Sequence, residues 1–146
     1  MRRSTAKKVI EYNSIIFDSK DEMLYYQYLQ NLQQLGHIRG FERQVRIELI
    51  PALTTFEGNK QRPICYVADF LVHVTAGYSV YVEIKGFANV LDLIKRKLYN
   101  YWSSKQEKPI PLQWMSYSKK YGDASGFCTY EELQQKRKET KNAKTV

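Results

Sequence analysis

Asp69, Glu83 and Lys85 are the residues of this chain whose types and spacing could do chemistry. Glu83 and Lys85 lie two apart in the segment 79–85, which is rich in Val, Ile and Tyr and predicts a β-strand. Side chains two apart in a strand point to the same face, so both are expected on one face. Asp69 interrupts the apolar segment 64–74, a second predicted strand, and a buried carboxylate requires a partner.

The connection between these two strands decides whether Asp69 shares that face. Directly opposed residues of an antiparallel hairpin lie on the same face, so Asp69 can oppose Glu83 only across an odd-numbered loop. A three-residue loop of Thr75, Ala76 and Gly77 meets this condition, and its third residue must be left-handed, as glycine readily is. A two-residue turn would place Asp69 on the other face. The position of Gly77 favours the first arrangement.

Two carboxylates in this arrangement predict a bound cation. At about 4 Å they repel by roughly 4 kcal/mol at an effective dielectric near 20. A fold tolerates the repulsion if one group is protonated or a cation lies between them, and hard oxygen ligands suit Mg²⁺ or Mn²⁺. Lys85 beside them can stabilise a pentavalent phosphate or orient the attacking water. The set predicts phosphodiester hydrolysis, and the alternative is a structural ion pair between Asp69 and Lys85.

Helix and strand signals predict the elements that position these residues. Ser19-Lys20-Asp21-Glu22 matches a capping box and begins a helix from about Lys20 to Leu35, which Gly36 ends. A second helix is expected from about Asn89 to Ser104. Strands are expected at 9–17, 41–50, 64–74, 79–85 and 113–115, with a hairpin loop around Glu57-Gly58-Asn59. Arg43, Val45, Ile47 and Leu49 should share one face of the second of these strands.

The order helix-β-β-β-helix-β predicts an α+β sandwich with a mixed β-sheet, because only the strand after the second helix returns by a crossover. At 146 residues the chain fits one domain, expected at 9–130. Basic residues 1–8 are expected to form an N-terminal tail. Residues 131–146 are expected to form a charged C-terminal tail that continues a short helix begun near Thr129.

The composition and net charge of the chain limit the classes of partner that it can be expected to bind. There is no apolar run of about 18 residues and no signal-peptide core, so no membrane partner is expected. Neither Cys65 and Cys128 nor His37 and His73 have the spacing of a zinc site, and the expected location is cytoplasmic. The net charge of +8 favours a polyanion such as DNA, although the basic termini are explained as easily by solvated tails.

The pattern of Asp69 followed by Glu83-Ile84-Lys85 on consecutive strands resembles the PD-(D/E)XK nuclease superfamily. The likeness is nearest to its small phage-associated members, including Holliday junction resolvases, and extends from about Phe17 to Trp114. It departs from the motif at Ala68, where the family pattern has proline.

The resemblance implies a restriction-endonuclease-like core and roles for individual residues. By that likeness Asp69, Glu83 and the Ile84 carbonyl would ligate Mg²⁺ (or Mn²⁺). Glu22 would reach in from the first helix as a further ligand, although it is also the expected capping-box partner of Ser19. Lys85 would be the catalytic lysine.

Residues around this set are candidates for contacts with DNA. Lys97 shares a helix face with Val90, Ile94 and Tyr101 and is expected to point toward the site as an additional catalytic residue, with a solvated or DNA-facing role as the alternative. Lys95, Arg96 and Gln44 are candidate DNA-binding residues, although Gln44 is explained better as a polar surface residue.

The sequence therefore predicts a Mg²⁺-dependent deoxyribonuclease that cuts branched DNA. As a small enzyme cutting two strands symmetrically, it is expected to act as a homodimer. The resemblance places it in a bacterial host cell and suggests a phage source. The alternatives are a recombination-linked or restriction-like nuclease with another substrate, and a non-catalytic DNA-binding module on the same scaffold.

Overall fold

The computed structural model describes residues 8–144, and the predicted N-terminal tail lies outside that range except for Lys8. A five-stranded mixed sheet has the order β3-β6-β7-β8-β9. Only the β7–β8 pair is parallel, and the other pairs are antiparallel. The strands of this sheet are β3 (Ile38–Ile50), β6 (Ile64–Val74), β7 (Ser79–Ile84), β8 (Leu112–Tyr117) and β9 (Phe127–Thr129). The predicted α+β class with a mixed sheet is confirmed.

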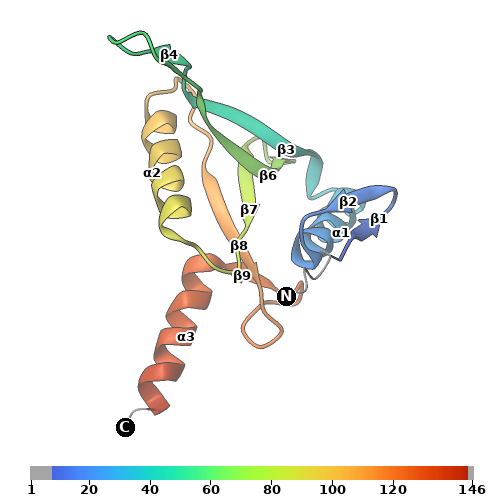
Figure 1. Ribbon diagram of the computed structural model, residues 1–146. Coiled ribbons are helices and arrows are strands. Elements are labelled where there is room, and N and C mark those ends of the chain that lie inside the picture. Colours follow the sequence, from blue (N-terminus) through green and yellow to red (C-terminus); the bar gives the residue numbers. More distant parts are fainter. Residues whose placement is uncertain (1–7, 145–146) are drawn as a thin grey trace.

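Helices lie on both sides of this sheet (Figure 1). They are α1 (Lys20–Gln34), α2 (Val90–Ser104) and α3 (Tyr130–Lys144). Helix α1 ends at the C-cap Leu35 and is followed by left-handed Gly36, with a φ of 80°. Two small hairpins complete the fold: β1 (Ile10–Tyr12) with β2 (Ile15–Phe17), and β4 (Leu53–Thr54) with β5 (Lys60–Gln61). Within the described residues, no helix combines the length and apolar character needed to cross a membrane.

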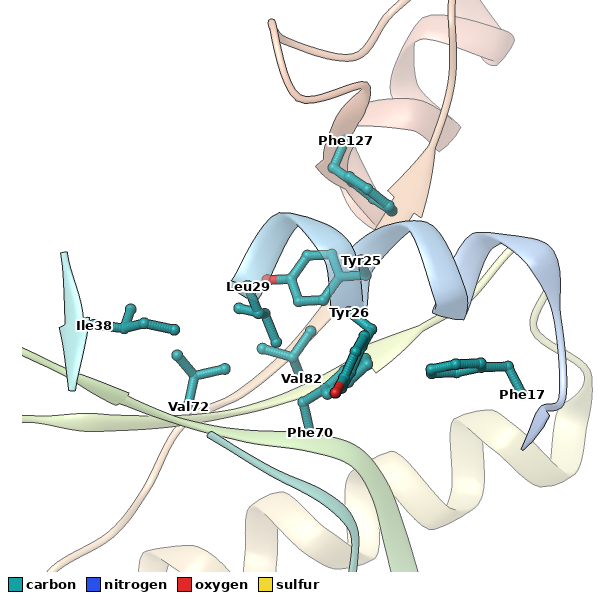
Figure 2. Close-up of a cluster of buried hydrophobic side chains, with 9 residues drawn as sticks. All are labelled: Phe17, Tyr25, Tyr26, Leu29, Ile38, Phe70, Val72, Val82 and Phe127. Atoms are coloured by element: carbon teal, nitrogen blue, oxygen red, sulfur yellow. The ribbon is translucent and has the colours of Figure 1, made fainter. Parts of the chain in front are cut away.

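Two hydrophobic clusters hold the helices to opposite faces of the sheet. In the first, Tyr25, Tyr26 and Leu29 of α1 pack on sheet residues that include Phe70 and Val82 (Figure 2). The second cluster places Tyr99 of α2 against other sheet residues, which are Ile47, Leu49, Tyr66 and Ala68. Because the consecutive residues Tyr81 and Val82 belong to different clusters, the clusters lie on different faces of β7.

The strict alternation predicted for β3 is wrong. Phe41 packs with the α1 cluster and the Arg43 guanidinium lies 4.4 Å from the Phe17 ring, whereas Ile47 and Leu49 pack with α2. A regular strand would place all four on one face. The alternation breaks at Gln44, whose φ of 50° is left-handed. The paired strand β6 breaks opposite it, since Phe70 packs with α1 and Ala68 with α2.

The C-terminal segment is more structured than predicted. Strand β9 was not predicted at all, and helix α3 continues to Lys144. Phe127 is 2% exposed and Leu133 1% exposed, so both belong to the core. The predicted boundary at residue 130 therefore cuts through packed structure, and the charged tail expected at 131–146 is helical as far as the structure describes it.

Candidate active site

The β6–β7 hairpin has the three-residue loop and the register from which Asp69 was predicted to oppose Glu83. The ladder runs from His73 opposite Ser79 to Phe70 opposite Val82. Thr75, Ala76 and Gly77 form the loop, and Gly77 has a φ of 108°. Continuing this register by one residue sets Asp69 opposite Glu83. The ladder ends there, and the Asp69 Oδ2 atom instead accepts a 2.8 Å hydrogen bond from the Ile84 N–H.

Glu83 and Lys85 lie on the face of β7 that Tyr81 presents to α2. The Lys85 Nζ atom is 3.5 Å from Glu83 Oε1 and 3.2 Å from Asp92 Oδ1, so two carboxylates hold the ammonium. The Lys85 side chain is only 14% exposed. Asp92 is the third residue of α2 and forms a capping box with Asn89. The first turn of α2 therefore positions Lys85 while completing its own cap.

Two buried aromatic residues, Tyr66 and Trp114, hold the Glu83 carboxylate in place. The buried Tyr66 hydroxyl donates a hydrogen bond to Glu83 Oε2 and accepts one from the Trp114 indole N–H at 2.9 Å. Burial and then the Glu83 charge raise the pKa of Tyr66, so this hydroxyl remains a donor. Neither aromatic residue was predicted from the sequence, because their packing partners come from strands 48 residues apart.

Glu22 turns toward the site and not toward its own helix end. Ser19 accepts a hydrogen bond from the Glu22 N–H, which forms one half of the predicted capping box. The Glu22 carboxylate instead accepts hydrogen bonds from Arg43 Nη2 at 3.2 Å and Gln44 Nε2 at 3.0 Å. The residue is 2% exposed. A buried carboxylate paired with a guanidinium is held in a fixed place.

Gln44 joins the carboxylate of α1 to the carboxylate of β6. Its amide Nε2 atom donates to Glu22 Oε1 at 3.0 Å and to Asp69 Oδ1 at 3.4 Å. A left-handed backbone at a non-glycine residue costs on the order of 1–2 kcal/mol. Such strained positions cluster at functional sites, where the surrounding structure holds them. Gln44 thus contacts two of the carboxylates named as metal ligands, and its backbone explains how a strand residue reaches both groups.

The environment of Asp69 disfavours its charge. Its pKa is raised to about 7, mainly by burial and also by the nearby carboxylates of Glu22 and Glu83, while the Ile84 N–H and the Gln44 amide act in the opposite direction. Burial also raises the pKa of Glu22. By contrast, the Asn89 N–H and the Lys85 ammonium lower the pKa of Asp92. A cation at Asp69 would offset both the burial of its charge and its repulsion from Glu22 and Glu83.

The donor set suits a hard divalent cation. Asp69 and Glu83 supply carboxylate oxygens, and the Ile84 carbonyl belongs to the residue whose N–H already contacts Asp69. Among residues 8–144 no group of three or more His, Cys, Asp or Glu side chains converges closely enough to hold an ion. The carboxylates instead contact donors of the protein: Glu22 accepts from Arg43 and Gln44, Asp69 from Gln44 and the Ile84 N–H, and Glu83 from Tyr66 with Lys85 beside it.

Two basic residues of α2, Lys95 and Arg96, have different surroundings. Lys95 helps to line a cavity of about 150 Å³ together with Tyr66, Val67, Glu83 and Asp92. The Arg96 guanidinium lies 3.9 Å from the Trp114 ring and pairs with Glu131 of α3 at 2.6 Å.

The inward orientation predicted for Lys97 is wrong. Lys97 is exposed, and Val90, Ile94 and Tyr101 on the same face are 72%, 52% and 66% exposed. Lys97 was expected to point inward because it shares this apolar stripe, and apolar helix faces normally pack on the core.

Comparison with known proteins identifies a family. A family model described as "Protein of unknown function (DUF1064)" matches residues 1–123. No curated protein matches the chain, and no solved structure matches it.

Proposed function

We propose that this chain, which belongs to the DUF1064 family, is a metal-dependent deoxyribonuclease that hydrolyses phosphodiester bonds. The observation that carries the proposal is the position of Asp69. Its half-buried carboxyl lies among the charges of Glu22 and Glu83, with the Lys85 ammonium held 3.5 Å from Glu83. A structural ion pair between Asp69 and Lys85 would not explain this arrangement, because Lys85 pairs with Glu83 and Asp92 instead.

Asp69, Glu83 and the Ile84 carbonyl would hold a Mg²⁺ or Mn²⁺ ion, with Glu22 as a further oxygen donor on the α1 side. The bound ion would supply positive charge against the phosphate and make water a stronger nucleophile. Gln44 and the Ile84 N–H orient the Asp69 carboxylate. Tyr66 orients Glu83 in the same way.

Lys85 would stabilise the negative charge that develops on the phosphate during attack. Its ammonium is already fixed by Glu83 and by Asp92, so little side-chain freedom is lost when the substrate binds. Lys95 lies at the neighbouring cavity and would contact the DNA backbone as a point charge. The net charge of +8 supports a polyanionic substrate.

The substrate proposed is branched DNA, on the resemblance described above, and the active unit proposed is a homodimer. The test is cleavage of labelled four-way junction, flap, duplex and single-stranded DNA with Mg²⁺, Mn²⁺ or EDTA. We expect paired, metal-dependent cuts in the junction that vanish in Asp69→Asn and Lys85→Met. Glu48→Gln, which removes an exposed carboxylate of β3, is the control and should cut normally.

The same assay separates the alternatives. Equal cutting of every substrate would support a general nuclease. If junctions bind equally well with Mg²⁺ and with EDTA and nothing is cut, the catalytic proposal fails and a DNA-binding module takes its place.

A further inference from the structure

The outer side of helix α2 is apolar, although it faces away from the sheet. The inner side buries Tyr99 and Ser103, and Figure 1 shows the opposite side of the helix at the edge of the fold. Large hydrophobic side chains on α2 and just before it are between 45% and 82% exposed: Phe87, Val90, Leu91, Leu93, Ile94 and Tyr101. The helix thus has two apolar sides, and the sheet covers one of them.

The size of this outer apolar face matches a protein interface. From the exposed fractions, the six residues present on the order of 700 Å². The largest apolar patch of a monomer is about 300–600 Å², whereas each partner in a stable interface buries about 800 Å². Together with the side chains around its edge, the face is large enough for a specific dimer.

We propose that two copies of this chain pair through the outer apolar face of α2, antiparallel about a two-fold axis. Val90, Ile94, Lys97 and Tyr101 recur at intervals of three and four and form one stripe along the helix. An axis between positions 95 and 96 sets Val90 against the partner's Tyr101 and Ile94 against the partner's Lys97. The stripe is then self-complementary, as a two-fold interface requires.

The charges of the stripe agree with this pairing. Lys97 is its one charged residue, and the antiparallel arrangement opposes it to Ile94 and not to a second lysine. The Lys97 stem can cover the apolar side chain while its ammonium reaches water at the rim. Antiparallel helices also bring opposite ends of their macrodipoles together. The pairing stands on these side chains alone and does not depend on nuclease activity.

The oligomeric state of the full chain tests the proposal. In sedimentation velocity from about 1 to 100 μM, we expect a dimer for the wild type and a monomer for Val90→Glu, whose carboxylate would lie against the partner's Tyr101 and not against a cation. The dissociation constant should rise at least ~100-fold, because the dimer would bury unpaired carboxylates. Phe56→Glu is the matched control, since Phe56 is 103% exposed in the β4–β5 hairpin and should leave the dimer intact. Circular dichroism checks that both variants are folded.

Cysteine cross-linking tests the direction of pairing. Val90→Cys and Tyr101→Cys chains, mixed and oxidised in a Cys65→Ser background, should form mainly the mixed disulfide. A wild type that is monomeric at 100 μM, a dimer that survives Val90→Glu, or a dimer lost equally in Phe56→Glu would overturn the proposal. Mainly Val90→Cys self-linking would overturn the antiparallel arrangement. A monomer whose Val90→Glu variant binds DNA more weakly would assign the face to DNA instead.

Discussion

At the scale of single residues, the Asp69 carboxyl is held where its charge is unfavourable. Its pKa rises from 3.8 to about 7 in the folded chain. Between about pH 4 and pH 7 the unfolded chain releases this proton while the folded chain keeps it, so the free energy of unfolding falls as pH rises. The full penalty, on the order of 4 kcal/mol, applies above about pH 7.

Asp69→Asn should therefore remove this pH dependence. We expect the variant to be more stable than the wild type at pH 8 and similar to it near pH 4, because the amide never ionises. Urea unfolding at both pH values measures the difference, with Glu48→Gln as the control that keeps the wild-type slope. An equal loss of stability with pH in Asp69→Asn would show that other groups cause it.

Gln44 combines backbone strain with two hydrogen bonds, and substitution can separate them. Gln44→Gly and Gln44→Val both lose the contacts to Glu22 and Asp69, but only valine forces a β-branched side chain into a left-handed backbone. We expect the valine variant to be less stable by about 2 kcal/mol. At the neighbouring exposed Arg46, valine should instead be better than glycine, as in an ordinary strand. Chemical denaturation of the four variants measures their free energies of unfolding. Equal stability of the two Gln44 variants would exclude backbone strain at this position.

At the scale of elements, the loop at Gly77 fixes the register that brings Asp69 to Glu83. Gly77 has a φ of 108° and open space around its Cα, so an added Cβ is opposed by backbone strain alone. Gly77→Ala should cost about 1–2 kcal/mol. Gly86→Ala is the control, because Gly86 is equally open but lacks a positive φ, and it should be nearly neutral. Comparable thermal midpoints for the two variants would contradict this account.

The elements predicted from the sequence are those with local signals. Ser19 and Gly36 bound α1 as predicted, and the Gly77 loop set the hairpin register. The hairpin turn at Asn13 and Ser14, both with positive φ, was missed because neither residue is glycine.

Features that depend on long-range packing could not be predicted in this way. The break in β3 at Gln44 exists because Arg43 reaches Glu22 on α1 while Ile47 packs under α2. An alternating pattern does not reveal such a change of face. The same limit explains the wrong orientation predicted for Lys97, since the sequence of an apolar helix stripe does not show whether the stripe faces the core or the solvent.

At the scale of the whole molecule, the C-terminal elements support the site although the family model ends at residue 123. Tyr130 packs edge-on against Trp114 at 5.2 Å, and Glu131 pairs with Arg96. Trp114 in turn donates to Tyr66, which donates to Glu83. Helix α3 is thus linked to the candidate active site through two aromatic residues.

The last prediction concerns where the folding unit ends. A chain that stops at Ser125 loses Phe127 and Leu133, which are 2% and 1% exposed, and core losses of this kind cost about 2–5 kcal/mol each. Since a domain is stable by only about 5–15 kcal/mol, we expect that chain to be unfolded or strongly destabilised. A chain that stops at Thr140 keeps both residues and the hydrogen bond between Tyr121 and Thr140 and should melt like the full chain. Thermal unfolding of the two truncations decides, and a cooperative, wild-type-like transition in the shorter one would show that the folding unit ends with the family match.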